Sequence, residues 1–119
     1  MQYLLMLYSE ENGWSKMSKA EQEQAVVAYS AYTEALTKSG ALKGTGRLQF
    51  TSTATTVRVA NGKPQVLDGP YADSKEQLGG YYLIDVPDLD AAISWASRCP
   101  AASHGIVEVR PVWLPPYDR

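Results

Sequence analysis

Residues 2–8 read QYLLMLY, and this stretch decides the fold of the chain. It is apolar almost throughout and does not alternate between polar and apolar side chains. A short apolar run of this kind is typical of a strand that is buried on both faces. The chain is therefore predicted to open with such a strand, and the rest of the fold has to cover both of its sides.

A long helix is predicted next, over Lys19–Ser39. Ser18 and Glu21 have the spacing of a capping box, in which each residue satisfies a free amide of the other at the start of a helix. Gly40 fits the left-handed position that ends a helix. Apolar and aromatic side chains recur at helical spacing between these ends, at Ala25, Tyr29, Tyr32 and Leu36.

The rest of the chain divides into short elements. Asn61-Gly62 stands between two runs of strand type, which predicts a β-hairpin. The elements expected on either side of that turn, in chain order, are a loop at 10–17, a flexible point at Gly44–Gly46, strands at 55–59 and 65–67, a helical turn at 74–78, a strand at 81–86, a helix that begins at Asp88 and stops at Cys99-Pro100, and a strand at 106–112.

This order of elements, β-α-β-β-β-α-β, predicts a ferredoxin-like α+β sandwich within a single domain over residues 1–119. Right-handed crossovers put both helices on one face of the antiparallel sheet. The other face would then be open, although the first strand is apolar on both sides. A second copy of the chain is the simplest cover, so we expect a homodimer in which the two sheets face each other.

Composition excludes several classes of protein. The chain has 119 residues, a formal net charge of −2, one Cys and one His. It therefore offers no intrachain disulfide, no electrostatic case for direct nucleic-acid binding and no His- or Cys-rich metal site. Its glycines match no phosphate-binding loop, so no cofactor is expected. The longest apolar run is too short to span a membrane and lacks the features of a signal peptide, which favours the cytoplasm.

A recognisable string covers residues 68–86, DGPYADSKEQLGGYYLIDV. It resembles the signature of the DGPF proteins, a branch of the YCII-related family, and residues 99–102 and 104–113 resemble the C-terminal part of that family. The resemblance implies a bacterial protein built as a dimeric α+β barrel of ferredoxin-like subunits. It also implies kinship with small-molecule enzymes that use a His–Asp pair, with the His on the first helix. Here that position falls at or near Tyr29, and the helix contains no His.

Asp68 and His104 are the candidate catalytic residues. Asp68 stands at a strand end before Gly-Pro, where it is either a general base or the cap of its own turn. His104 is the sole imidazole and hence the sole side chain with an ordinary pKa near neutrality. It is either an acid/base partner for Asp68 or a loop residue that bonds a carbonyl.

Further candidates would bind a ligand. Glu108 and Arg110 alternate with valines on the last strand, and Arg58 does so in the hairpin, so these charges point away from the apolar side. An ion pair between subunits is one interpretation of them, and binding of a carboxylate is the other. Lys75 and Glu76 either orient an anionic substrate or form a solvated surface. Tyr82 could line an aromatic pocket, whereas Tyr29 and Tyr32 are expected in the core, and Cys99 is expected to be a structural thiol at a helix end.

Two functions are compatible with these residues. In the first, the dimer binds a small acidic or aromatic-derived molecule near its interface and acts as a cofactor-independent isomerase or lyase through proton transfer. In the second, it is a non-catalytic binding or regulatory module, which the resemblance links to sigma-factor-type transcription regulation.

Overall fold

A computed structural model describes residues 1–115. Its centre is a four-stranded antiparallel sheet with the strand order β2-β5-β1-β6. The elements are β1 (Gln2–Ser9), α1 (Glu11–Lys16), α2 (Lys19–Ser39), β2 (Leu42–Arg47), the 3-10 turn η1 (Thr51–Thr53), β3 (Thr55–Ala60), β4 (Lys63–Asp68), β5 (Gln77–Asp85), α3 (Leu89–Arg98), the 3-10 turn η2 (Pro100–Ser103) and β6 (Ile106–Pro111).

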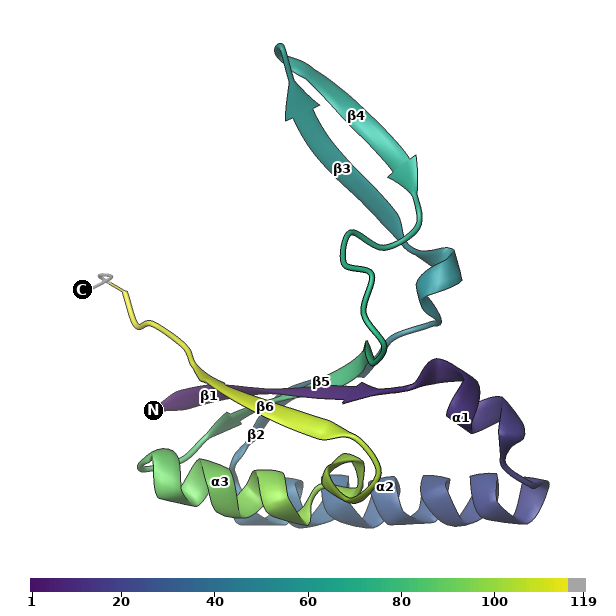
Figure 1. Cartoon of the computed structure of the whole chain (residues 1–119). Coiled ribbons are helices and arrows are strands. Elements are labelled where there is room, and N and C mark those ends of the chain that lie inside the picture. The colour runs from purple at the N-terminus through teal and green to yellow at the C-terminus, as the bar shows by residue number, and fades with distance from the viewer. Residues whose placement is uncertain (116–119) are drawn as a thin grey trace.

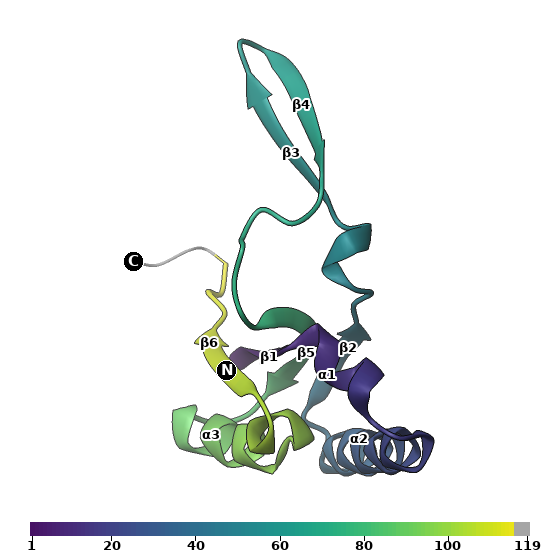
Figure 2. The same cartoon turned by 45° about the vertical axis from the view of Figure 1, so that its right-hand side comes forward.

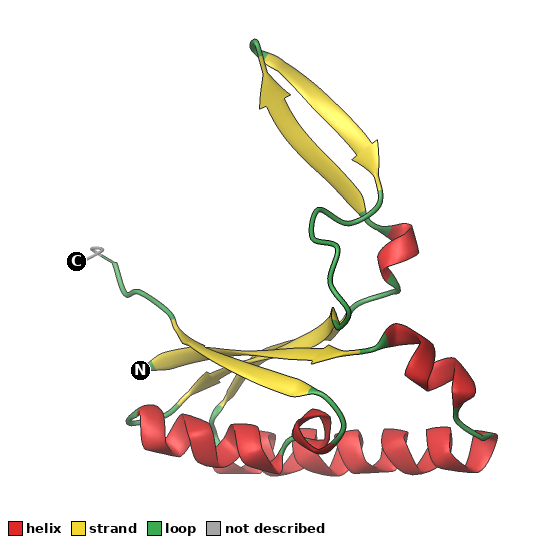
Figure 3. Cartoon of the chain, in the orientation of Figure 1, coloured by secondary structure: helices red, strands yellow, loops and turns green. Residues whose placement is uncertain are grey.

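The two long helices, α2 and α3, lie side by side under one face of this sheet (Figures 1 and 2). The core forms between the two layers, where Leu5, Leu36 and Ile84 are fully buried. Figure 3 shows the layers by element type: among the described residues neither α2 nor α3 lies on the other face of the sheet, and the short turn η1 stands on that side at the base of the hairpin. The predicted ferredoxin-like α+β fold is therefore confirmed.

Local chemistry sets the helix ends as the sequence predicts. The Ser18 hydroxyl accepts a hydrogen bond from the Glu21 amide at 3.1 Å, and the Glu21 carboxylate accepts one from the Ser18 amide at 2.9 Å. Gly40 ends α2 with a φ of 79°, in the left-handed region. The Asp88 carboxylate caps α3 by accepting from the Ala91 amide at 2.9 Å.

The first strand alternates more strictly than its sequence suggests. Tyr3, Leu5 and Leu7 are buried against the helices, whereas Leu4, Met6 and Tyr8 are half-buried on the other face. We call this second surface the open face; the register of the sheet adds Tyr81 and Leu83 from β5 and Glu108 and Arg110 from β6. The sequence predicts that the first strand is buried on both faces, but within a single chain only the face toward the helices is buried.

Two elements differ from expectation because tertiary contacts create them. Residues 10–17 are not simply a loop, since α1 forms there and Trp14 packs under the Arg47 guanidinium, whose carbon lies 4.8 Å from the ring centre. The presumed flexible point at Gly44–Gly46 is part of β2, an edge strand of the sheet. Gly46 leaves room there for the Tyr81 ring, which would have to shift because a Cβ would come within 2.9 Å of it.

The hairpin of β3 and β4 forms a separate two-stranded sheet that rises from the open-face side of the molecule (Figure 1). The predicted turn is confirmed, with positive φ at both Asn61 (53°) and Gly62 (74°). The helical turn expected at 74–78 is wrong: Gln77 already begins β5, whose pairing with β1 and β2 takes precedence over local helix formation.

Candidate functional site

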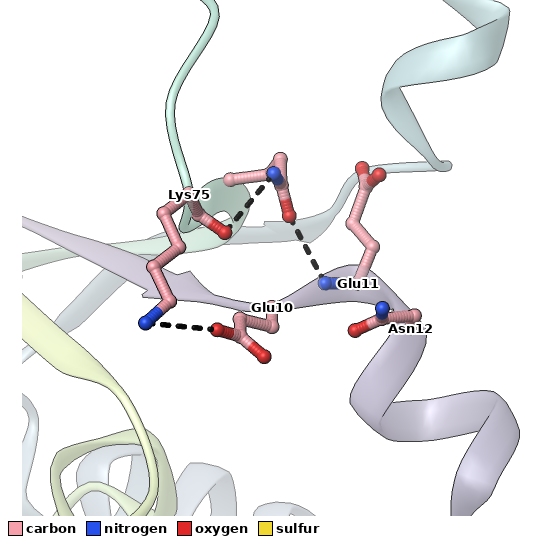
Figure 4. A pocket seen from close by; sticks show the side chains of 5 residues that line it. Glu10, Glu11, Asn12 and Lys75 are labelled. Atoms are coloured by element: carbon pink, nitrogen blue, oxygen red, sulfur yellow. Dashed lines mark hydrogen bonds and ion pairs between the residues drawn. The ribbon is translucent and has the colours of Figure 1, made fainter.

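A polar pocket of about 330 Å³ lies where β1 ends and α1 begins, beside the segment that returns from the hairpin to β5 (Figure 4). Its lining residues are Glu10, Glu11, Asn12, Lys75 and Gln77. Three of these five side chains carry charge, so the pocket suits a polar or ionic ligand. A second hollow of about 360 Å³ between α3 and β6 is lined without charged residues, by side chains such as Ile93, Ile106 and Val109.

Gln77 organises the floor of the polar pocket. Its side-chain oxygen accepts a hydrogen bond from the Glu11 amide at 3.0 Å. Its side-chain nitrogen donates to the carbonyls of Ser74 at 2.7 Å and Lys75 at 3.2 Å. One amide therefore ties the end of β1 to the segment that presents the Lys75 side chain.

Lys75 and Glu10 face each other across the pocket, with the ammonium nitrogen 3.8 Å from a carboxylate oxygen. The Lys75 side chain is 87% exposed and that of Glu10 is 48% exposed. A long, exposed ion pair of this kind is weak, because water competes for both charges. Both groups are consequently available to a ligand.

The Glu11 carboxylate bonds Thr51 and not Lys75. It accepts hydrogen bonds from the Thr51 amide at 2.6 Å and from the Thr51 hydroxyl at 2.8 Å. Thr51 begins η1, the turn that leads into β3. Glu11 therefore anchors the base of the hairpin to α1 and acts as a structural wall of the pocket.

This arrangement provides one cation and one available carboxylate a few ångströms apart. A lysine ammonium can hold an anionic oxygen, and a carboxylate can accept a proton from a neighbouring carbon or oxygen. Among residues 1–115, no three His, Cys, Asp or Glu side chains gather where they could hold a metal ion. The ammonium of Lys75 and the carboxylate of Glu10 suit the pocket to anion binding and to proton transfer.

The structure places Asp68 and His104 on different parts of the molecule. Asp68 is exposed at the end of β4, next to Gly69 with a φ of 103°. His104 is exposed after η2, on the way to β6. Within residues 1–115, neither side chain makes a hydrogen bond or ion pair to the other, and the predicted turn cap by the Asp68 carboxylate does not form either.

Glu108 and Arg110 form an ion pair on the same strand, with 2.6 Å between nitrogen and oxygen. The charges that seemed to need a partner in another subunit thus have one in each other. Arg58 lies apart from them, on β3 of the hairpin. Lys75 is the predicted ligand-binding residue that lines the polar pocket; Glu76 is half-buried beside it, and its carbonyl accepts from the Ser74 hydroxyl at 2.5 Å.

Tyr82 lies in the core and lines neither of the two hollows. Its hydroxyl is 2.8 Å from that of Thr33, and burial raises its pKa. Tyr32 is a core residue as expected, since its hydroxyl donates to the Trp95 carbonyl at 2.7 Å. Cys99 is buried as well, and burial raises the pKa of its thiol, in keeping with a structural role.

Sequence reasoning missed Glu10, Glu11 and Gln77. Two adjacent carboxylates directly after a buried strand are a signal that could have marked the site, but Asn12-Gly13 favours a solvated turn at this point.

The helices of the described residues include none with the length and apolar character needed to cross a membrane.

Comparisons with known proteins agree with this fold. The YCII-related domain matches residues 1–115. An uncharacterised protein of Rhizobium meliloti (strain 1021) is 40% identical over 116 residues, covering 96% of this chain and 94% of its own. A solved structure of 5-chloro-2-hydroxyhydroquinone dehydrochlorinase from Burkholderia phenoliruptrix, in complex with 2,5-dihydroxybenzoquinone, matches with a TM-score of 0.55 and 16% identity. That match covers 99% of this chain and 100% of the other.

Proposed function

Because the chain belongs to the YCII-related family, we propose that it binds a small acidic or aromatic-derived molecule in the polar pocket and acts on it as a cofactor-independent isomerase or lyase. The observation that carries this proposal is the pair of Lys75 and Glu10, an available cation and an available carboxylate that face each other across a pocket of about 330 Å³. A volume of this order suits a ligand of one ring.

In this proposal Lys75 binds the ligand and Glu10 transfers the proton. The Lys75 ammonium holds a carboxylate or enolate oxygen of the ligand and stabilises negative charge that develops there. Glu10 removes a proton from the adjacent carbon, and the electron pair of the broken C–H bond moves into the ring. In an isomerisation the proton returns to another carbon; in an elimination the electron pair expels a leaving group as an anion. Gln77 acts as a positioning residue, since it fixes the backbone carbonyl of Lys75.

The structural neighbour supports this class of reaction by fold alone. Dehydrochlorination is an elimination, and that enzyme was solved with a hydroxylated quinone bound. A fold that accommodates such a ligand in one protein makes a ring-sized acid a reasonable first probe for this one.

The working unit of the proposal is a cytoplasmic homodimer. The open face carries Leu4, Met6 and Leu83 without a helix to cover them. Pairing of two open faces would remove these side chains from water. Asp68 and His104, distant in one chain, remain candidates for proton transfer only where a second copy brings them near a bound ligand. The regulatory alternative has no comparable observation in its favour.

Binding and proton transfer can be tested separately with 2,5-dihydroxybenzoquinone. Calorimetry measures its affinity, and NMR in D₂O follows exchange at its ring C–H positions. We expect Lys75→Met to weaken binding about tenfold or more, and Glu10→Gln to slow exchange about a hundredfold with little change in affinity. Matched controls are Lys38→Met and Glu34→Gln, which alter an exposed pair with a nitrogen–oxygen distance of 3.0 Å on α2.

Equal effects of the pocket and control variants would contradict the proposal. Loss of exchange in Asp68→Asn or His104→Gln, with Glu10→Gln unaffected, would move the proton-transfer site to the residues first predicted from the sequence.

A further inference from the structure

The hairpin of β3 and β4, which we call the arm, has one apolar face that its own chain leaves exposed. The register places Val57 opposite Val66 and Val59 opposite Pro64, so these four side chains share a face. Val57, Val59 and Val66 are 61%, 67% and 61% exposed. An arm that served only as a solvated loop would carry polar residues on both faces, so this face is suited to a partner.

The opposite face of the arm holds its basic side chains, together with Leu67, which lies opposite Thr56 and is 66% exposed. It carries Arg58 opposite Gln65, and Lys63 near the turn opposite Ala60. The arm carries two basic residues, Arg58 and Lys63, against one acidic residue, Asp68, although acidic residues outnumber basic ones in the chain, 13 to 11. The arm is therefore a positively charged extension of a molecule that is otherwise acidic, which favours attachment to a surface like the rest of this chain.

The base of the arm is held firmly. The Glu11 carboxylate bonds the Thr51 amide and hydroxyl on the outgoing side. At the same base, Gly69 joins the end of β4 to the start of β3: its amide donates to the Ala54 carbonyl at 2.8 Å, and its carbonyl accepts from the Thr56 hydroxyl at 2.7 Å. An isolated two-stranded hairpin is marginal in water, so these anchors and a partner surface together would account for its persistence.

The arm stands on the same side of the molecule as the open face (Figures 1 and 2). Two apolar surfaces that the described residues leave uncovered thus lie on one side of the molecule, and pairing of two identical copies about a two-fold axis would cover both at once. A different protein would need separate complements for each surface. The second copy is the occupant that the molecule itself already supplies.

We infer that the arm grips a second copy of the chain: the arm of each subunit reaches past the paired sheets and lays its Val57–Val66 face on its partner. This inference extends the proposed function, from which it takes only the homodimer. It assigns to residues 55–68 a role that pairing of the open faces alone does not require.

Neighbouring residues on β4 provide a sharp test. Val66→Lys and Gln65→Lys introduce the same charge one position apart, on opposite faces of the arm. Sedimentation equilibrium of the full chain over a range of concentrations gives the dimer dissociation constant. We expect Val66→Lys to raise it at least about a hundredfold and Gln65→Lys to change it less than about threefold. Val57→Lys, on the other strand of the same face, should repeat the first result, and circular dichroism confirms folding.

Leu83→Lys separates this inference from the dimer of the proposed function, because Leu83 lies on the open face and not on the arm. A dimer that is weakened by Leu83→Lys but not by Val66→Lys or Val57→Lys would overturn the role of the arm and retain the pairing of sheets. Equal effects of Val66→Lys and Gln65→Lys would overturn it as well. If the wild-type chain stays monomeric at about 100 μM, the arm does not bind a second copy and the inference is overturned; the partner would then be a different protein.

Discussion

Replacement of Glu11 by Ala tests whether this carboxylate anchors the arm. The substitution removes the acceptor of two hydrogen bonds, from the Thr51 amide at 2.6 Å and the Thr51 hydroxyl at 2.8 Å. Hydrogen bonds to a charged acceptor contribute about 1.5–3 kcal/mol each when they are buried. Glu11 is only half-buried and water can replace part of the loss, so we expect about 2 kcal/mol for the pair.

That free energy applies to local opening of η1 and is measured by hydrogen exchange of the Thr51 amide. A loss of about 2 kcal/mol corresponds to about a thirtyfold lower protection factor. Glu11→Gln keeps one acceptor oxygen and should give an intermediate value.

Glu10→Ala is the matched control, since it removes the adjacent carboxylate and its 3.8 Å ion pair with Lys75. An exposed pair of this kind contributes less than about 1 kcal/mol, and Thr51 does not take part in it. Protection of Thr51 should therefore change about twofold at most. If Glu10→Ala and Glu11→Ala lower it equally, or if neither does, the anchoring role of Glu11 is refuted.

Two further predictions concern the stability of the fold. Gly105→Ala should lower the free energy of unfolding by about 3 kcal/mol or more in urea titrations, because its Cβ would overlap the Tyr8 carbonyl oxygen. Gly13→Ala, with nothing within 4 Å, should be neutral or stabilise by up to about 1 kcal/mol. Burial raises the pKa of Tyr29 from 10.0 to about 12 in the folded protein. Between pH 10 and 12 the unfolded chain therefore loses the Tyr29 proton before the folded chain does, and this lowers the free energy of unfolding. Below pH 10 the hydroxyl is protonated in both states and stability is unaffected by it. The urea midpoint should fall from pH 10 to 12, and a constant midpoint across that range would contradict the assignment.

Local side-chain chemistry explains why much of the fold is predictable. The limits of α2 follow from Ser18, Glu21 and Gly40, each of which bonds or bends the backbone within a few residues of itself. The turn at Asn61-Gly62 is of the same kind, because both residues adopt positive φ at little cost. Helix ends and turns that depend on residues close in the sequence can thus be predicted without knowledge of the rest of the molecule.

The elements that escape prediction depend on residues far away in the sequence. The glycines of β2 resemble a flexible linker until Tyr81 is seen to lie across Gly46. The helix α1 contains a glycine and six residues in all, and its Trp14 packs on Arg47 of another element. The polar pocket is equally non-local, since Glu10 and Lys75 meet only after the hairpin has been closed.

The central position of β1 has a consequence for the way in which the chain is made. This strand is synthesised before both of its neighbours in the sheet, β5 and β6, which end at Asp85 and Pro111. At about 5–20 residues per second, translation leaves the backbone hydrogen-bonding groups of this apolar strand unpaired for about 5–20 s. β1 therefore lacks its sheet partners while most of the domain is being made, and the sheet can be completed only after β6 has emerged.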